Sequence, residues 1–522
     1  MRRLETPVAE IAQGEDIATI IARRAGRGVA RPAVIHDERV VRWGDHAARV
    51  HQVANALIAL GIRKGHRVAM LARNCIEYQE AFLGTLVAGG CAVPLPTMAS
   101  RKALKLMLED CGAKVLIVSG TYREEVASFA QALPRILAEG LIGFDFEAGP
   151  FRAYDAWVGA ASKEAPGVEI TPEDEFNIIY SSGTTGLPKG ILHDHRVRAA
   201  QAKVFAAFDF SADTVNLVST PIYSNTTITT WLPTVWFGGV NVMMAKFEAR
   251  AFLELLQKHR ATHTMLVPVQ YDRILRVHDY DDFDRSSMQF KFSTSAPLRE
   301  KLKRELVERF EGELVEFYGL TEGGVTCTLF ASRFPDKLAS VGRPAGGELR
   351  IIDEEGNELP AGRTGEIVGR GYNMMRGYVN REDATDELLW RDRQGNLFFK
   401  TGDVGRLDED GFLFLRDRKK DVIISGGFNI YATDLEDVLL GHEAVHEAAV
   451  IGVPSQRWGE TPLALVVLEE GFDLDAETLR SWANQRLGKG QQIAALEIRQ
   501  ELPKSEIGKV LKRDLRSPYW GR

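Results

Sequence analysis

The sequence predicts an α/β protein made of several folding units, and three observations lead to this prediction. The chain has 522 residues, which is more than one ordinary hydrophobic core accommodates. Segments with apolar residues at helical spacing alternate with short apolar runs, as in parallel sheets covered by helices. Short strands and turns replace this alternation from about Gly346 onward, which predicts a separate β-rich part.

Two α/β units account for the alternating segments. The first begins with a helix, and its helices and strands are expected in turn at 44–62, 67–72, 76–89, 91–96, 101–111 and 114–119. The second begins with a strand, and its elements are expected at 241–245, 251–259, 263–267, 299–310 and 314–319.

The rest of the chain predicts a β-rich unit and a separate C-terminal unit. Short apolar runs joined by hairpin signals occur within 348–371 and 402–418. The charged stretch 416–421 then marks a domain boundary. A last group of helices and strands is expected at 434–441, 447–454, 463–470, 476–487 and 495–503.

Composition excludes some classes of partner. The chain carries 65 Lys and Arg against 72 Asp and Glu, a net charge of −7, so it has no overall attraction to nucleic acid or to an anionic membrane. The longest apolar run, 81–96, is shorter than the ~20 residues of a membrane-spanning helix and is broken by glycines and a proline. The four cysteines are scattered, and the N-terminus lacks the apolar core of a signal peptide, so we expect a cytoplasmic protein.

A loop rich in glycine and hydroxyl residues, YSSGTTGLPKG, spans Tyr180 to Gly190 directly after a strand-like run. Glycines let a ligand approach the backbone, and N–H and O–H groups donate hydrogen bonds to phosphate oxygens. The P-loop of NTP-hydrolysing enzymes needs a hydroxyl residue after its lysine, whereas Gly190 follows Lys189 here. The loop therefore predicts a phosphate site of another kind.

Further motifs follow in order: STSAPL (293–298), EFYGLTEGG (316–324), KTGDVG (400–405), RDRKKDVIISGGFNIYATDLE (416–436) and LPKSEIGKVLKRDL (502–515). With the loop, they resemble the signature of the adenylate-forming superfamily of acyl- and aryl-CoA ligases, peptide-synthetase adenylation domains and firefly luciferase. The resemblance covers nearly the whole chain. It implies a large N-terminal α/β domain, 1–417, with two α/β subdomains of mainly parallel sheets and a small β-rich subdomain. It also implies a small, mobile α+β C-terminal domain, 418–522.

The resemblance implies an ATP site with magnesium, an ion that prefers hard oxygen ligands. The loop would wrap the β- and γ-phosphates through Ser181, Ser182, Gly183, Thr184, Thr185, Gly186 and Lys189. Adenine would be surrounded by Ser295, Ala296, Pro297, Glu316, Phe317, Tyr318 and Gly319, with Tyr318 stacking on the base. The α-phosphate would contact Thr321, Mg²⁺ would bind Glu322, and the ribose would bind Asp403 and Arg418.

The resemblance also implies catalytic and acid-binding residues. The catalytic residues would be Lys509, Glu322 and Thr185, and the hinge of the C-terminal domain would be Lys420. The channel for the pantetheine arm of CoA would be bordered by Gly426 and Gly427, and the acid pocket would be lined by Tyr223, Ser224, Asn225 and Val269. Two positions depart from the family pattern: Ser224 stands where a histidine is common, and Asp417 where a glycine is common.

These roles imply an ATP-dependent carboxylic acid–CoA ligase that forms acyl-AMP and pyrophosphate, and then acyl-CoA and AMP. We expect a fatty acid or another apolar monocarboxylate as substrate, in fatty acid metabolism. The alternative substrate is an aryl or alicyclic acid. The alternative function is that of a free-standing adenylation enzyme that loads a carrier protein. A nucleotide sensor without catalysis is disfavoured by Lys509, Glu322 and Asp403. A homodimer is left open.

The stretch HEAVH at 442–446 fits the HExxH zinc pattern. That pattern needs both histidines on one face of a continuous helix. Gly441 predicts the end of a helix, and 447–454 predicts a strand, so the sequence disfavours a zinc site here.

Overall fold

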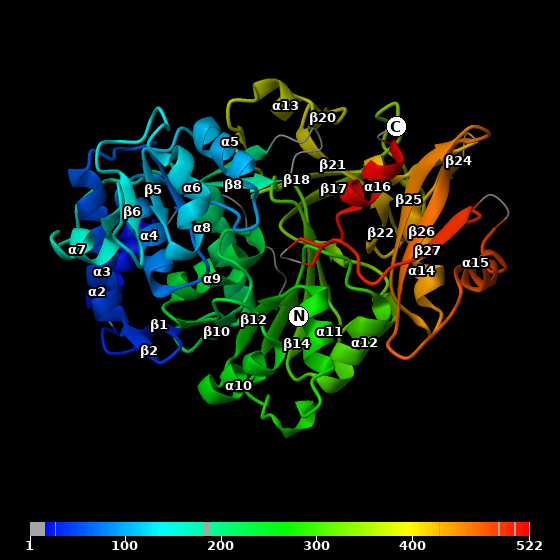
Figure 1. The fold of residues 1–522 in the computed structure, drawn as a ribbon, viewed down its shortest axis with the longest axis horizontal. Coiled ribbons are helices and arrows are strands. Elements are labelled where there is room, and N and C mark those ends of the chain that lie inside the picture. Colours follow the sequence, from blue (N-terminus) through cyan, green and yellow to red (C-terminus); the bar gives the residue numbers. More distant parts are fainter. Residues whose placement is uncertain are drawn as a thin grey trace. The chain divides into compact units, whose positions relative to one another are not determined.

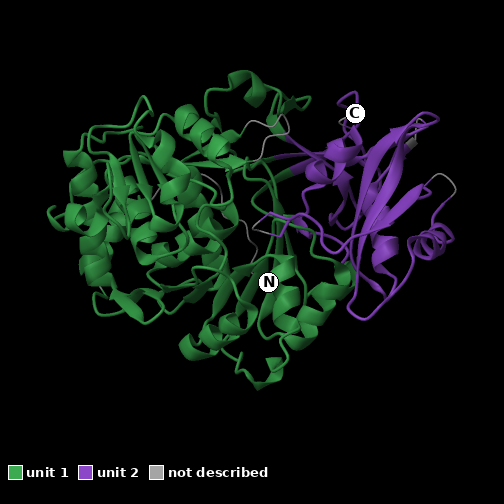
Figure 2. Cartoon of the chain, viewed as in Figure 1, with its two compact units in different colours: residues 1–338, 344–348, 370–399 green, residues 339–343, 349–369, 400–522 purple. Residues whose placement is uncertain are grey.

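The structure is a computed structural model that describes residues 16–26, 28–181, 188–426, 428–488, 491–505 and 508–520. Figure 1 shows the course of the chain, and Figure 2 colours its two compact units. Unit 1 comprises Met1–Leu338, Pro344–Glu348 and Arg370–Phe399, and unit 2 comprises Ala339–Arg343, Leu349–Gly369 and Lys400–Arg522.

A nine-stranded sheet holds the second predicted α/β region. Its strands, in spatial order, are β16 (Arg343–Pro344), β15 (Thr326–Phe330), β14 (Glu313–Gly319), β13 (Phe290–Ser293), β12 (His263–Leu266), β10 (Val215–Val218), β11 (Val240–Met243), β1 (Pro32–His36) and β2 (Arg39–Arg42). The strands from β14 to β1 are parallel, whereas β15 pairs antiparallel with β14, and β2 pairs antiparallel with β1. The prediction of a mainly parallel sheet is confirmed.

An eight-stranded sheet holds the first predicted α/β region. Its spatial order is β19 (Gly377–Tyr378), β9 (Lys189–Asp194), β8 (Glu175–Ser181), β4 (Cys91–Pro94), β3 (Arg67–Leu71), β5 (Val115–Val118), β6 (Leu141–Gly143) and β7 (Arg152–Ala153). The strands from β8 to β7 are parallel, and β9 runs antiparallel to β8.

Helices cover both sheets of unit 1. Those described are α2 (Ile17–Gly26), α3 (Trp43–Ala59), α4 (Ile76–Val87), α5 (Arg101–Cys111), α6 (Arg123–Ala130), α7 (Tyr154–Gly159), α8 (His195–Val204), α9 (Asn225–Phe237), α10 (Ala249–His259), α11 (Pro268–Leu275), α12 (Glu300–Arg309) and α13 (Glu382–Asp386). In α10, the apolar residues at helical spacing, Phe252, Leu253 and Leu256, are buried. The side chain of Glu248 caps its first turn by accepting hydrogen bonds from Arg250 N and Ala251 N.

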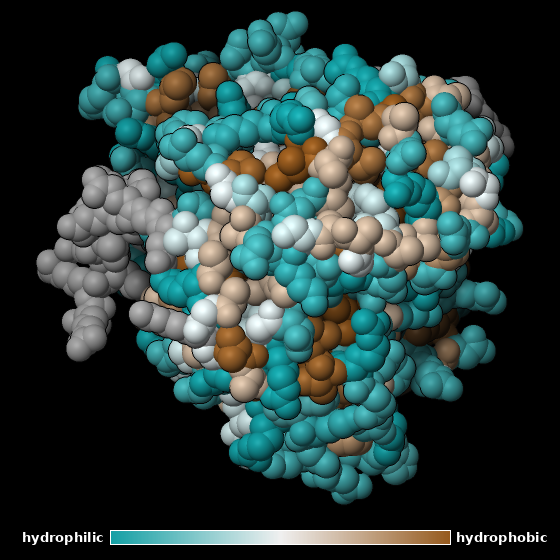
Figure 3. All heavy atoms as spheres, turned by 90° about the vertical axis from the view of Figure 1, so that its left-hand side faces the viewer, coloured by the Kyte–Doolittle hydropathy of each residue, from teal (hydrophilic) through white to brown (hydrophobic). Residues whose placement is uncertain are grey.

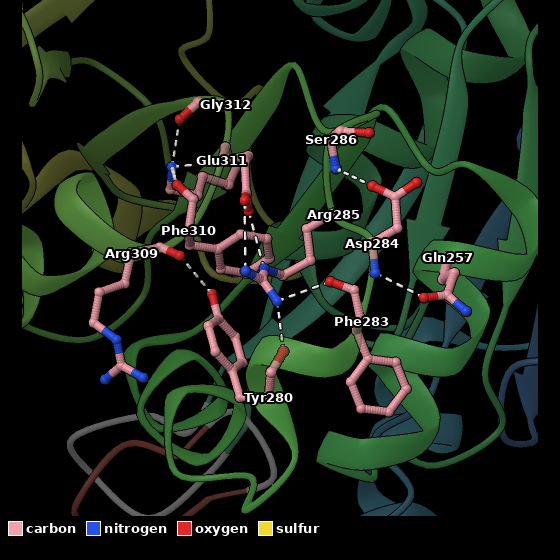
Figure 4. A network of polar contacts seen from close by, with 11 residues as sticks. Gln257, Tyr280, Phe283, Asp284, Arg285, Ser286, Arg309, Phe310, Glu311 and Gly312 are labelled. Atoms are coloured by element: carbon pink, nitrogen blue, oxygen red, sulfur yellow. Dashed lines mark hydrogen bonds and ion pairs between the residues drawn. The ribbon is translucent and has the colours of Figure 1, made fainter.

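A polar network closes the turns that follow α11 and α12 (Figure 4). Arg285 donates to the carbonyl oxygens of Tyr280 at 2.5 Å and Phe283 at 2.9 Å, and its Nε lies 3.0 Å from a carboxylate oxygen of Glu311. The guanidinium also lies over the Tyr280 ring, 4.1 Å from its centroid. The charge of Arg285 is therefore buried beside a carboxylate, which reduces the cost of burying it.

Two smaller sheets complete the fold. One contains β17 (Gly347–Ile352), β18 (Gly365–Gly371), β21 (Leu397–Leu407) and β20 (Leu389–Arg391), and β22 (Leu413–Arg418) pairs with β21. The other, in unit 2, contains β24 (Phe428–Ile430), β23 (Ile423–Ser425), β26 (Gly459–Leu468) and β25 (Val445–Ser455), and β27 (Ala495–Ile498) pairs with β26. Unit 2 also contains α14 (Ala432–Leu440), α15 (Ala476–Asn484) and α16 (Lys512–Trp520).

The predicted α/β, β-rich and α+β parts are confirmed. The helix expected before Gly441 ends at Leu440, and His446 lies in β25, so His442 and His446 do not share a helix. The domain boundary after residue 417 and the hinge at Lys420 stay predictions.

The surface offers no broad apolar face in the view of Figure 3, where hydrophobic residues form patches separated by hydrophilic ones. Among the described helices, none is both long enough and apolar enough to cross a membrane.

Candidate functional site

The residues predicted to bind the acid and the adenine gather at one edge of the nine-stranded sheet. Strands β10, β12, β13 and β14 are parallel neighbours, so their carboxyl ends lie at the same edge. The segments that follow these strands carry Tyr223 to Asn225, Val269, Ser295 to Pro297, and Thr321 with Glu322. Ligands of α/β proteins bind outside the carboxyl ends of strands, so this edge is the candidate site of unit 1.

Glu322 lies beside an aromatic ring from a distant part of the chain. The hydroxyl of Tyr378 donates to Glu322 Oε1 at 2.8 Å, and Lys189 Nζ lies 4.9 Å from the centroid of the same ring. Burial and the Glu322 carboxylate raise the pKa of Tyr378, so its hydroxyl stays protonated. Tyr378 therefore links the lysine of the glycine-rich loop to the predicted magnesium ligand.

The Glu322 side chain suits the predicted magnesium ion. It is partly exposed, and Mg²⁺ typically binds one or two carboxylates together with phosphate oxygens and waters. Among the described residues, no three His, Cys, Asp or Glu side chains are placed to hold a metal ion together. The fit therefore rests on this carboxylate and on the oxygens that a bound nucleotide would add.

Gly323 fixes the backbone beside Glu322. Its φ is +82°, and a Cβ atom at this position would lie 1.8 Å from the carbonyl oxygen of Asn373. The backbone N–H of Met375 donates to the carbonyl oxygen of Glu322 at 2.9 Å. A side chain at residue 323 would therefore push the Glu322 segment away from the segment that carries Tyr378.

Ser295 joins the predicted adenine segment to the predicted acid segment. Its hydroxyl lies 2.5 Å from the hydroxyl of Thr226 in the first turn of α9. Its φ of +76° is uncommon for a residue other than glycine. Ala296 and Pro297 follow in the same loop, where Ala296 is partly buried and Pro297 is exposed.

Ser224 has a structural role that a histidine would not fill. It is the N-cap of α9, and its hydroxyl accepts a hydrogen bond from Thr226 N at 3.3 Å. Tyr223, Asn225 and Val269 are partly exposed, as a pocket lining requires.

The EFYG motif divides between the two faces of β14. Glu316 is buried and forms an ion pair with Lys303 at 2.5 Å, and burial raises the pKa of its carboxyl group. Phe317, one residue on, stacks on Phe292 at a centroid distance of 5.5 Å. Tyr318 is buried, and Gly319 is exposed at the strand's end. The Phe317 ring is therefore partly buried and packs against the core of this sheet.

Two residues that the motifs do not include lie next to these segments. Arg198 in α8 is 1 % exposed and donates to Asn225 Oδ1 at 2.8 Å. It also lies 3.2 Å from His193 Nδ1, and His193 Nε2 lies 2.8 Å from the carbonyl oxygen of Thr321. Burial lowers the pKa of Arg198 to about 9, so the guanidinium is still charged at neutral pH. Burial and Arg198 lower the pKa of His193, which is therefore neutral.

Unit 2 brings three other predicted residues together. Asp403 in β21 pairs across the sheet with Arg418 in β22, and its Oδ1 lies 3.1 Å from Arg418 Nε. Lys509 is exposed, yet the protein atoms near its ammonium group and the positive charge of Arg418 lower the pKa of that group to about 8. Gly508, with a φ of +70°, makes the turn that presents Lys509.

Asp417 ties two backbone segments of unit 2 together. Its carboxylate accepts hydrogen bonds from Arg418 N and Ala432 N, both at 2.7 Å. Burial raises the pKa of this carboxyl group. Lys420 follows in a short 3-10 turn, Lys419–Asp421, where the Asp421 carboxylate pairs with Arg516 at 2.7 Å. An aspartate at residue 417 therefore restrains the backbone next to the predicted hinge, where a glycine would leave it free.

Gly426 lies against an exposed tryptophan of unit 2. Its N–H donates to the Trp458 carbonyl oxygen at 2.8 Å, and a Cβ atom on Gly426 would lie 2.8 Å from the indole ring.

In unit 1, Ser181 and Lys189 pair across β8 and β9, at the two ends of the glycine-rich loop. The remaining predicted residues lie outside the described part of the chain: Ser182, Gly183, Thr184, Thr185, Gly186 and Gly427.

Comparisons with known proteins agree with these motifs. The family model described as AMP-binding enzyme matches residues 21–379, and the one described as AMP-binding enzyme C-terminal domain matches residues 434–509. A feruloyl-CoA synthase of Amycolatopsis is 33% identical over 501 residues, which are 95% of this chain and 98% of that protein. A long-chain-fatty-acid–CoA ligase of Mycobacterium tuberculosis is 31% identical over 518 residues, 97% and 99% of the two chains. The crystal structure of ATP-bound MatB from Rhodopseudomonas palustris superposes with a TM-score of 0.86 at 28% identity, covering 97% and 99% of the two chains.

Proposed function

Since the chain belongs to the family of AMP-binding enzymes, we propose that it is an ATP-dependent carboxylic acid–CoA ligase. In the first step the acid and ATP form acyl-AMP and pyrophosphate, and in the second acyl-AMP and CoA form acyl-CoA and AMP. The observation that carries the proposal is the edge of the nine-stranded sheet, where the predicted acid and adenine segments follow parallel strands. The proposed cation is Mg²⁺, and the proposed compartment is the cytoplasm.

The first step is limited by charge repulsion. A carboxylic acid with a pKa near ~4 is already ionised at neutral pH, so it needs no general base. It must, however, approach the polyanionic ATP, and cations at defined positions offset this repulsion. Mg²⁺ held by Glu322 would supply such charge when bound. Lys509 would hold a proton on Nζ and place its ammonium charge on the reacting oxygens, and Lys189 would face the departing phosphates.

The acid is proposed to be a fatty acid or another apolar monocarboxylate, with an aryl acid as the second candidate. The relatives support both, since one is named for a feruloyl substrate and another for long-chain fatty acids. The partly exposed Tyr223 supports either class, because an aromatic ring packs against chains and rings alike.

A panel of acids tests the proposed function. With purified protein, ATP and Mg²⁺, we expect pyrophosphate release that depends on the acid and is largest for one class among fatty, aryl and alicyclic acids. Adding CoA should then yield the thioester and AMP in equal amounts. Transfer to a carrier protein but not to CoA would favour the carrier-loading alternative, and pyrophosphate release that no acid stimulates would contradict the proposal.

The rate of the first step should fall at alkaline pH. Because the pKa of Lys509 is lowered to about 8 from its ordinary value of 10.5, the ammonium form is present below that pH and is lost above it. We expect kcat/KM for acid-dependent pyrophosphate release to decline with a midpoint near pH 8. The variant Lys509→Arg keeps its charge, so this decline should move to higher pH even if the rate is low. An unchanged midpoint in that variant would show that another group titrates.

A further inference from the structure

Arg198 is a buried cation whose hydrogen bonds all go to neutral groups within the described residues. Its Nε donates to Asn177 Oδ1 at 2.8 Å, and its Nη1 donates to Gln201 Oε1 at 2.7 Å and to Asn225 Oδ1 at 2.8 Å. Its Nη2 donates to His193 Nδ1 at 3.2 Å. A buried charge without an opposite charge on hydrogen-bonding partners is costly, so its presence calls for an explanation.

Arg285 is the other arginine that is buried among the described residues of unit 1, and it shows the contrast. Arg285 is 8 % exposed and lies beside the Glu311 carboxylate, in a network that closes two turns (Figure 4). The carboxylate nearest to Arg198 in sequence, Asp194, instead caps α8 by accepting from Val197 N and lies 3.3 Å from Arg196. Arg285 is therefore stabilised by a direct ion pair, whereas Arg198 has only the longer-range attraction of Asp194 and donates its hydrogen bonds to neutral acceptors.

The contacts of Arg198 lead to both predicted binding segments. The Thr321 carbonyl can only accept, so His193 Nε2 carries the proton and His193 Nδ1 accepts from Arg198. This path ends at the residue before Glu322. The other path ends at Asn225, the first residue of α9, beside the Thr226 hydroxyl that contacts Ser295. One planar guanidinium thus fixes the distance between the two segments.

We infer that Arg198 is a positioning residue that couples the acid-binding segment to the ATP-binding segment. This inference rests on the proposed function. Binding of the acid at Asn225 would order the guanidinium, and the guanidinium would order His193 and the backbone at Thr321, so each substrate would bind more tightly in the presence of the other. The charge of Arg198 also adds a positive potential at a site for two anions.

The variant Arg198→Met tests the inference, because methionine fills much of the volume and donates no hydrogen bond. We expect the Kd for ATP with Mg²⁺, measured by calorimetry, and the KM for the acid, measured by pyrophosphate release, each to rise by roughly tenfold. Lysine keeps the positive charge but lacks the planar guanidinium that donates to several acceptors at once. The variant Arg198→Lys should therefore also have a raised Kd for ATP and a raised KM for the acid. The matched control Arg285→Met should lower the melting temperature and leave both constants unchanged. If Arg198→Met also lowered only the melting temperature, or if it raised only the Kd for ATP or only the KM for the acid, the inference would be overturned.

A second variant covers the case in which Arg198→Met does not fold. Asn225→Ala removes one acceptor at a partly exposed residue of the acid segment. We expect it to weaken ATP binding severalfold although it lies outside the predicted ATP motifs, and an unchanged Kd for ATP would contradict the coupling. This measurement needs neither acid nor CoA. If Asn225→Ala weakens ATP binding but the unsubstituted protein releases no pyrophosphate with any acid, the proposed function is contradicted and the coupling is not.

Discussion

Replacing Lys509 by alanine should reduce acid-dependent pyrophosphate release by roughly 10²–10³-fold, the cost of losing one preorganised charge at a developing anion. The same variant should still convert supplied acyl-adenylate and CoA to thioester at nearly the normal rate. In that second step the phosphoryl chemistry is complete, and the charge that Lys509 offsets is no longer formed. The measurement is the rate of each half-reaction alone.

The structure offers a matched control for this variant. Lys504 lies in the same turn, but its ammonium group is already paired with the Glu447 carboxylate. Lys504→Ala should therefore leave pyrophosphate release close to normal and change mainly the stability of unit 2. Equal losses of both half-reactions in Lys509→Ala would contradict the two-step assignment, and so would a Lys504→Ala variant as slow as Lys509→Ala.

Most of the fold could be predicted because the elements have strong local signals. The helices α3 and α10 have apolar residues at helical spacing, α4 is apolar on nearly every side, and the parallel strands read as short apolar runs between the helices. The helix end at Gly441 could be predicted because glycine is common just after the last helical residue, and α14 does end at Leu440, although the φ of −73° at Gly441 is one that any residue adopts. The order of strands in the two large sheets could not be read from these signals, since neighbours such as β10 and β12 are separated in the chain by three other elements, α9, β11 and α10.

The departures from the family pattern could be located in the sequence but not explained there. The structure explains Ser224 as the N-cap of α9. The sequence could not show this role, because it does not say which residue precedes the first helical turn. Asp417 could be seen to replace a common glycine, but only the structure shows that its carboxylate accepts two hydrogen bonds from backbone N–H groups. A carboxylate bonded to N–H groups on two segments resists their separation.

Arg198 and His193 could not be found from the sequence. In HDHRVRAAQ an arginine looks like one of several charges on a solvated helix face, which is the usual place for such residues. The structure differs because α8 turns Arg198 inward, toward amide side chains from β8 and α9. A buried polar network joins residues that are distant in sequence, so no local sequence pattern predicts it.

Replacing Glu322 by glutamine should lower acid-dependent pyrophosphate release by roughly 100-fold or more, because a metal ion that polarises phosphate oxygens contributes several kcal/mol. Glutamine has nearly the same shape and can still accept the Tyr378 hydroxyl, so the local fold should persist. The half-saturating Mg²⁺ concentration should rise together with the loss of rate. The measurement is a Mg²⁺ titration of pyrophosphate release at saturating ATP and acid.

The variant Tyr378→Phe separates metal binding from local structure. It removes the hydrogen bond to Glu322 but keeps the ring beneath Lys189 and the carboxylate itself. This hydrogen bond orients the carboxylate but does not hold the cation, so its loss should lower the rate less than Glu322→Gln does, and the Mg²⁺ requirement should change little. If Glu322 served only to hold Tyr378, Glu322→Gln would be the milder variant and neither would alter the Mg²⁺ titration. That order of effects would remove Glu322 from the proposed metal site, whereas the opposite order places the cation on its carboxylate.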